Sequence, residues 1–395
     1  MPQPASKRER AIGSSFAQGI QLVRDTTPDH LNAVSFQGRG EVRGDASRFC
    51  GSVILGGSFS VAIDAVRRIQ TNSLGGTFMN QPLVSRDVWP QLPIAEWTDT
   101  LATLHLWTQI VGKVRLELSP WINHSWQATL YVTSRGLTTS PIPYGGNTFQ
   151  VDFDFINHGL VIATSSGSTV PLPLRSQTVA DFYRDFMAAL DSLGIDVSIH
   201  TMPNEIEDPI PFPEDRVHSS YEPEQVHLFW RALVQSARVF EAFRARFTGK
   251  CSPVHFFWGS FDLAVTRFSG RPAPNHPGGI PHLPDVVTVE AYSKEVSSCG
   301  FWPGNAGAPD PVFYSYSYPA PEGFAEHPVK PDAAFWLADL GEFVLPYEAV
   351  RTADDPDATL TAFLETTYEA AADLADWDRA VFERPAGYTP YQPKG

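Results

Sequence analysis

Two stretches of the chain carry the same three anchors in the same order. In each stretch a Ser-Pro pair is followed by a Trp and, after eight further residues, by an Arg. The first runs from Ser119 to Arg135 and the second from Ser252 to Arg267. This internal repeat predicts two related halves that meet at a seam, and ligand pockets often open at such seams. Because identity between the halves is low, two unrelated neighbouring segments are the alternative.

The first half is predicted to begin and end with a helix. Apolar residues at helical intervals favour helices over residues 97–111 and 178–193, and Gly112 and Gly194 follow them. Strand-like runs lie between the two helices, and the turn-forming residues around them favour antiparallel neighbours. These runs cover residues 114–118, 128–134, 149–155 and 160–163.

The second half repeats this order of elements. Helical spacing predicts a long amphipathic helix over 229–247 and a last helix over 360–374. The strand-like runs between them cover residues 253–268, 286–296, 312–318 and 341–345. The whole chain is therefore predicted to be an α+β protein with two helix, antiparallel-sheet and helix halves and a weakly structured N-terminal extension.

Charge and composition divide the chain further. The first 85 residues hold nine Lys and Arg against six Asp and Glu, a net charge of +3 that leaves −18 for the remainder. A stretch rich in proline and acidic residues separates the halves and suits an extended connector. The predicted boundaries are 1–85 for the extension, 86–202 for the first half, 203–223 for the connector, 224–385 for the second half and 386–395 for a tail.

The composition also excludes classes of function. A net charge of −15 without a basic cluster argues against binding to nucleic acids or anionic membranes. No run reaches the roughly 20 apolar residues of a membrane span, and the first residues lack the apolar stretch of a secretory signal. The three cysteines have no metal-ligand spacing and are expected to be free thiols. We expect a soluble, cytoplasmic protein.

The second half is longer than the first. From Ser252 to Leu345 is 93 positions, whereas the matching distance from Ser119 to Leu172 is 53. The additional residues fall in two loop-like stretches, 271–282 and 300–330. Since long loops on a rigid scaffold often carry functional residues, we expect a pocket in the second half.

Several residues of this half are candidates for chemistry. His255 and Asp262 lie in one strand-like run, where strict alternation would place them on opposite faces. His255 is either a hydrogen-bonded core residue or an acid–base group. A carboxylate among apolar neighbours, such as Asp262, needs a cationic partner or a shifted pKa. Arg267 or Arg271 would supply that partner.

A second group lies in or beside the loops. Glu295 and Lys294 form a candidate acid–base or substrate-anion pair, although neighbouring residues of a strand point to opposite faces, and we favour Glu295 for the pocket. His276 lies in a loop without the spacing of a zinc site. No metal site is predicted and the cofactor is unknown, although a ligand set of His255, His276 and Glu295 across the fold stays open.

Aromatic residues are dense around the second loop. They either pack in the core or form a wall that stacks a planar or cationic ligand. The six within 18 residues are Phe301, Trp302, Phe313, Tyr314, Tyr316 and Tyr318. The sequence shows no Walker loop, Gly-x-Ser-x-Gly elbow, His-Glu-x-x-His or Cys-x-x-Cys motif that would name a reaction.

Three segments of the second half, 255–264, 295–304 and 313–316, are distinctive, and the second ends in Gly-Phe-Trp-Pro-Gly. They resemble an uncharacterised bacterial family that is classed only as a domain of unknown function. The resemblance covers about residues 89–385 and implies a soluble bacterial protein without indicating an activity. In the family's pattern a His often precedes the Glu, whereas this chain has Lys294, which argues against a mechanism that needs an imidazole there.

These observations predict a small-molecule enzyme of undefined reaction class. The candidate catalytic residues are His255, Glu295 and Asp262. The candidate substrate-binding residues are Arg267, Arg271, His276, Lys294, Trp302 and Tyr314. A non-catalytic module that binds a metabolite or a protein is the alternative, and an assembly role is a third hypothesis. The oligomeric state is not predicted.

Overall fold

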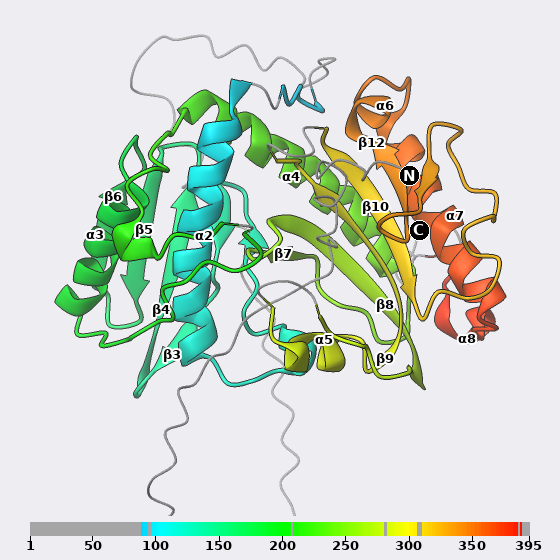
Figure 1. Cartoon of the computed structure of the whole chain (residues 1–395), viewed down its shortest axis with the longest axis horizontal. Coiled ribbons are helices and arrows are strands. Elements are labelled where there is room, and N and C mark those ends of the chain that lie inside the picture. The colour runs from blue at the N-terminus through cyan, green and yellow to red at the C-terminus, as the bar shows by residue number, and fades with distance from the viewer. Residues whose placement is uncertain are drawn as a thin grey trace, which may run out of the picture. The chain divides into compact units, whose positions relative to one another are not determined.

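The computed structural model describes residues 88–93, 96–206, 208–279, 283–305, 310–385 and 388. The predicted extension, residues 1–85, and the predicted tail apart from Tyr388 lie outside this part of the chain. Within it the fold is α+β, as predicted, with two antiparallel sheets of six strands each and helices packed beside them (Figure 1). None of the described helices is long and apolar enough to cross a membrane.

The first sheet has the strand order β1-β2-β4-β5-β6, and β3 also pairs with β4. Its strands are β1 (Tyr131–Val132), β2 (Gly136–Thr138), β3 (Ile142–Tyr144), β4 (Asn147–Asp154), β5 (Gly159–Thr164) and β6 (Thr169–Pro173). The helices α2 (Thr98–Leu118) and α3 (Val179–Ser192) belong to this half. Helix α3 begins as predicted, because the Thr178 hydroxyl accepts a hydrogen bond from the backbone N–H of Asp181.

The second sheet has the order β11-β12-β10-β9-β8-β7. Its strands are β7 (His255–Phe257), β8 (Asp262–Pro272), β9 (Lys294–Trp302), β10 (Val312–Tyr318), β11 (Phe335–Leu337) and β12 (Glu342–Pro346). The helices of this half are α4 (Pro223–Ala245), α5 (Asp285–Ala291), α6 (Tyr347–Arg351), α7 (Pro356–Leu374) and α8 (Arg379–Phe382). Short 3-10 turns η2 (Asn123–Ser125) and η3 (Phe212–Glu214) complete the described elements.

Helix α2 is longer than predicted, and the predicted strand over 114–118 is wrong. Gly112 does not end the helix. A Cβ atom there would lie 2.2 Å from the indole nitrogen of Trp258, so the glycine allows close packing. Nearly every residue of α2 from Thr100 to Leu116 is buried, so its apolar residues follow no one-sided helical period. The alternation of polar and apolar residues around Arg115 therefore resembled the pattern of a strand.

Two further strand predictions need correction. The run 253–268 is a hairpin of β7 and β8, in which His255 pairs with Ala264 and Phe257 with Asp262. Because paired residues of antiparallel strands share a face, His255 and Asp262 lie on the same face and not on opposite ones. The run 286–296 is split between α5 and the start of β9. Residues 300–302, predicted as loop, continue β9.

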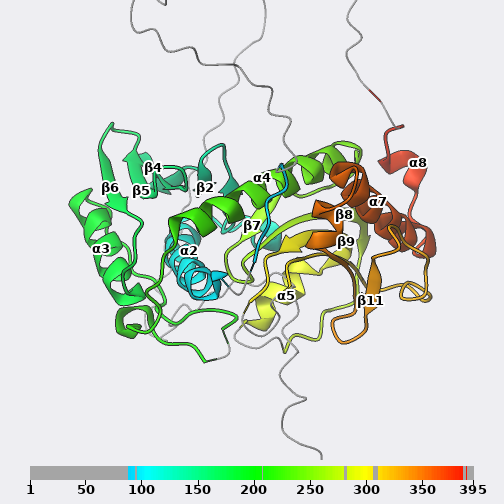
Figure 2. The ribbon, with the colours of Figure 1, turned by 90° about the horizontal axis from the view of Figure 1, so that it is seen from above.

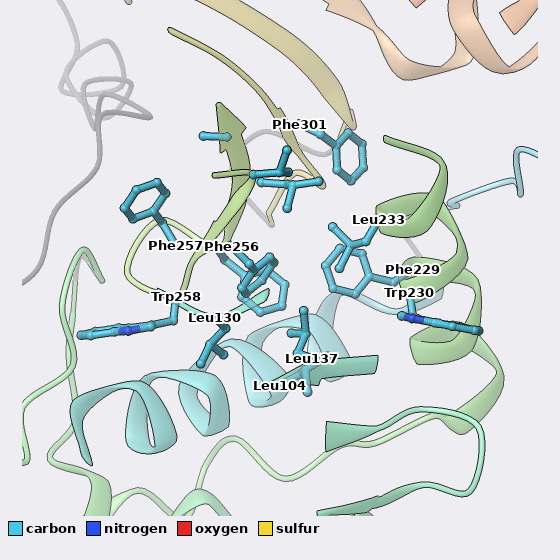
Figure 3. Close-up of a cluster of buried hydrophobic side chains, with 14 of the residues drawn as sticks. Leu104, Leu130, Leu137, Phe229, Trp230, Leu233, Phe256, Phe257, Trp258 and Phe301 are labelled. Carbon is cyan, nitrogen blue, oxygen red and sulfur yellow. The ribbon is translucent and has the colours of Figure 1, made fainter. Parts of the chain in front are cut away.

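The two sheets are joined at their edges. Leu130, just before β1, and Phe256 of β7 exchange two backbone hydrogen bonds of 2.9 Å. Helix α4 spans the junction and contacts α2, β1, β8 and α7. Figure 3 shows Phe229 and Leu233 of α4 pointing toward Phe256 and Phe301 in this core. The repeat itself is not confirmed, since Arg135 is exposed and paired with Asp154, whereas Arg267 is buried within β8.

Candidate functional site

The second sheet has two faces of different chemistry. The register places Leu263, Val265 and Arg267 of β8 on the face that packs against α4 and α7, which we call the helix face. The opposite face carries the alternate residues, and we call it the polar face. Its members are His255, Phe257, Asp262, Ala264, Thr266, Phe268, Val296, Ser298, Gly300, Trp302, Tyr314, Tyr316, Tyr318, Glu342 and Val344. In Figure 2, α4 lies on one side of this sheet and α5 on the other.

Asp262, the first residue of β8, lies on the polar face and is fully buried. Tyr314 donates a hydrogen bond to its Oδ2 and Ser260 donates one to its Oδ1. Gly300 on the intervening strand makes the first of these possible, because a Cβ atom there would lie 2.3 Å from the Tyr314 hydroxyl. Burial raises the pKa of Asp262 to about 7 from its usual 3.8, although both hydrogen bonds oppose the rise.

Two more carboxyl groups are electrostatically coupled to Asp262. Glu342 of β12 is buried, and burial together with the charge of Asp262 raises its pKa to about 8. The same two causes raise the pKa of Glu205, which lies in the segment between α3 and α4. One oxygen of each glutamate, Oε2 of Glu342 and Oε1 of Glu205, is buried without a hydrogen-bond partner among the described residues. These carboxyls thus favour their protonated forms near neutral pH.

Helix α2 holds Glu205 in position through its neighbour Asn204. The side-chain amide of Gln109 exchanges two 2.8 Å hydrogen bonds with the Asn204 backbone, and the ammonium group of Lys113 donates to Asn204 Oδ1 at 2.5 Å. Glu205 has a φ of 55°, which lies in the left-handed region. This conformation is unfavourable for residues other than glycine. Burial lowers the pKa of Lys113 to about 7.

Hydroxyl groups continue the polar face beyond Asp262. The hydroxyls of Thr266 and Ser298 lie 2.9 Å apart across β8 and β9. Tyr292, which follows α5, donates to the hydroxyl of Tyr316 at 3.1 Å. Burial raises the pKa of Tyr292, Tyr314 and Tyr316, so these phenols keep their protons and act as hydrogen-bond donors.

The structure brings some of the sequence-predicted residues together. Asp262 and Tyr314 are hydrogen-bonded, and Trp302 packs in the same aromatic cluster as Tyr314. His255 lies on the same face at the β7 end, surrounded by the rings of Trp126, Tyr131 and Phe257.

Other predicted residues lie apart from Asp262. Arg267 is on the helix face. Arg271 forms an ion pair with Glu295 at 2.7 Å, and both line a surface pocket of about 530 Å³ with Ser317 and Trp377. His276 stacks on Tyr292 at 4.8 Å. Lys294 lies near Lys250 and His124; burial lowers the pKa of both groups, and the charge of Lys294 contributes to the lowering.

Sequence reasoning missed Glu342, Glu205 and Lys113. Glu342 follows Gly341 and looks like an ordinary turn residue, but it begins β12, pairs with Leu337 of β11 and is buried. Glu205 lies in the acidic stretch predicted as a connector. Lys113 was the one charged residue among the apolar residues 110–112 and 114, which is the signal that could have marked it as buried.

In the part of the chain that the structure describes, no group of three His, Cys, Asp or Glu side chains could hold a metal ion.

Comparison with known proteins identifies the family and covers both halves of the described chain. The profile of the family of unknown function DUF5996 matches residues 89–384. The chain belongs to this family. The match begins at the second described residue and ends after α8, so the DUF5996 domain contains both sheets and the whole polar face. No curated protein and no solved structure matches the chain.

Proposed function

We propose that this DUF5996 protein is an enzyme that acts on a small molecule by acid–base chemistry at the polar face, with Asp262 as the group that moves the proton. The observation that carries the proposal is a fully buried carboxyl group whose pKa is raised to about 7. A group with a pKa near the working pH both accepts and donates protons efficiently. Tyr314 and Ser260 fix the orientation of the carboxyl.

Glu342 supplies the complementary role. Its pKa of about 8 keeps it largely protonated at pH 7, where about half of Asp262 is ionised. Two carboxyls whose environments separate their protonation states can serve as acid and base in one reaction. We assign Asp262 as the base and Glu342 as the acid, and Trp302 as an aromatic surface for the substrate.

A specific observation favours the second candidate function, a binding module without catalysis. Both oxygens of Asp262 already accept hydrogen bonds from the protein. A carboxyl engaged in this way can hold the sheet together or bind a donor group on a ligand without transferring a proton. A cytoplasmic location, a bacterial source and the absence of nucleic-acid and membrane partners remain predictions from the sequence.

A proton-exchange screen tests the proposal. Pools of small metabolites are incubated with the full chain in deuterium oxide, and mass spectrometry detects deuterium incorporation or a new product. Asp262→Asn is expected to lower turnover at least about 100-fold. Asp154→Asn, which changes an aspartate of the first sheet, is the matched control and is expected to retain turnover. Glu295→Gln tests the sequence-based candidate in parallel.

Two results would contradict the proposal, the first its assignment of Asp262 and the second its assignment of an enzymatic activity. Turnover that persists in folded Asp262→Asn would show that another group moves the proton. Ligands that stabilise the wild type but never exchange or react would establish the binding module instead.

A further inference from the structure

Buried polar atoms without partners gather where the end of α2 meets the start of β7. They are Arg115 Nη1, Ser125 Oγ, Gln127 Nε2 and both ring nitrogens of His255, and none has a hydrogen-bond partner among the described residues. Each of these residues is at least nine-tenths buried. Unsatisfied buried polar groups are rare in native proteins, and several in one place indicate a missing bonding partner.

Direct contacts connect these residues to one another. Arg115 Nε donates to the Gln127 carbonyl at 2.6 Å, and the Arg115 guanidinium lies 5.7 Å from the centre of the Tyr131 ring. That ring lies 5.6 Å from the imidazole of His255, and the ring of Trp126 lies 5.5 Å from the same imidazole. The group therefore has an aromatic frame with polar atoms inside it.

Arg115 has no negatively charged partner in the described part of the chain. Its side chain is 8% exposed, and no Asp or Glu forms an ion pair with it. Burial lowers the pKa of the Arg115 guanidinium. A buried guanidinium without an anion is energetically unfavourable, so a protein that keeps one commonly uses it to bind an anion.

Positive charge predominates around this group, although the chain as a whole carries −15. Burial and, to a lesser extent, the charges of Arg115 and Arg244 lower the pKa of His255 to about 3. Lys250 lies 5.3 Å from the Trp126 ring, and its ammonium group is 2.6 Å from His124 Nε2. The nearby acids are already engaged, since Glu241 pairs with Arg244 and Glu290 accepts a hydrogen bond from Trp121.

We infer that Arg115, Gln127 and His255 form an anion site that binds the carboxylate or phosphate group of a small molecule. The guanidinium Nη1 and the amide Nε2 donate to the oxyanion. His255 is neutral at pH 7 and donates through one ring N–H. Trp126 and Tyr131 exclude water and flank the part of the ligand next to the charged group.

The position of the anion site also indicates the substrate class of the proposed enzyme. This step rests on the proposed function. His255 pairs with Ala264, which lies two residues from Asp262 on the same strand face. Two residues of a strand span about 7 Å. A small organic acid or phosphate ester held at Arg115 would place atoms a few bonds from its charged group beside Asp262.

Anion titrations of the full chain test the site directly. Calorimetry and thermal unfolding are measured with inorganic phosphate and with acetate, at constant ionic strength made up with chloride so that screening does not change. Phosphate or acetate is expected to bind the wild type and raise its Tm, and which one binds identifies the oxyanion. Arg115→Met is expected to weaken binding at least tenfold, while Arg135→Met, which removes an exposed arginine, retains it.

Two further variants test the anion site independently of whether Arg115→Met folds. His255→Phe fits the same aromatic frame and is expected to weaken binding several-fold even if Arg115→Met unfolds. Equal stabilisation by chloride, or undiminished binding in Arg115→Met and His255→Phe, would overturn the anion site. Asp262→Asn is expected to bind the anion like the wild type, so loss of turnover in that variant and loss of binding in Arg115→Met separate the two proposals.

Discussion

A buried arginine lies at each face of the second sheet, but only one of the two has a carboxylate beside it. Arg267 on the helix face is 1% exposed, lies between the rings of Phe243 and Tyr368, and has Glu365 at 3.9 Å. Arg115 at the end of the polar face has one aromatic ring near it and no carboxylate among the described residues. Burial alone therefore does not distinguish a structural charge from a functional one.

The carboxyl groups show the same contrast. Glu365 is compensated by Arg246 at 2.7 Å as well as by Arg267. Asp262 and Glu342 on the polar face have no cation that lowers their pKa. The buried carboxyl of the helix face is therefore paired with cations, whereas the buried carboxyls of the polar face have no cationic partner among the described residues. Compensation of buried charge is thus the property that separates the two faces.

The largest expected effect is on the pH dependence of stability. The folded state raises the pKa of Asp262 from 3.8 to about 7, so it binds a proton that the unfolded chain releases. The stability contributed by this proton is complete below pH 3.8 and is lost as pH rises through 7. The loss amounts to about 4 kcal/mol. Asp262→Asn is expected to remove it, as measured by urea unfolding from pH 4 to pH 8.

Asp154 is the control for this experiment, because its pKa is shifted in the opposite direction. Hydrogen bonds from the backbone and from Arg135 lower the pKa of Asp154, so its contribution grows as pH rises. If Asp262→Asn unfolds with the same pH dependence as the wild type, Asp262 is compensated and the contrast between the faces disappears.

The next largest effect is the loss of stability on replacing each of the two arginines, Arg267 and Arg115. Arg267→Met leaves Glu365 with only Arg246 and removes the group between two rings, and it is expected to cost about 3 kcal/mol. Arg115→Met removes an uncompensated charge and is expected to change the free energy of unfolding by no more than about 1 kcal/mol. Chemical denaturation at pH 7 measures both values, and equal losses would show that Arg115 is a structural residue.

A smaller effect is expected at Gly300. Alanine there would place its Cβ 2.3 Å from the Tyr314 hydroxyl and 2.5 Å from the Leu263 carbonyl oxygen. Tyr314 must then move away from Asp262, at a cost of about 1–3 kcal/mol. Tyr314→Phe, which keeps the ring and removes the hydrogen bond, is the companion variant. A crystal structure of Gly300→Ala with Tyr314 still bonded to Asp262 would contradict this account.

The smallest effect is expected at His255. Its ring nitrogens have no partner in the described residues, and three aromatic rings surround it. His255→Phe is expected to leave the free energy of unfolding within about 1 kcal/mol of the wild-type value, measured without added anions. A loss of several kcal/mol would mean that His255 has a structural hydrogen bond.

The sequence could predict elements whose signals are local. Helix α3 has its capping Thr178, and β4 and β5 are separated by turn residues, so these elements lie where they were expected. The hairpin of β7 and β8 was missed although Gly259-Ser260 lies in its turn, because the apolar residues on both sides form one nearly continuous run. In this turn Phe261 takes a φ of 60°, which its sequence does not favour.

The candidate site could be predicted only in part, for a similar reason. Asp262 and Tyr314 were recognised as unusual residues of the second half, but their contact depends on Gly300, which lies on a third strand. Arg115 was absent from the sequence-based candidates because it lies in the half judged to be less active. Its lack of a partner is visible only once α2, β7 and the segment around Gln127 are brought together.

The most direct test of the account is the titration of the Asp262 carboxyl by carbon-13 NMR with labelled aspartate, using Asp262→Asn to assign the signal. The expected result is a midpoint near pH 7. A midpoint below pH 5 would show that the charge of Asp262 is compensated within the protein, and the contrast between the two faces would not hold.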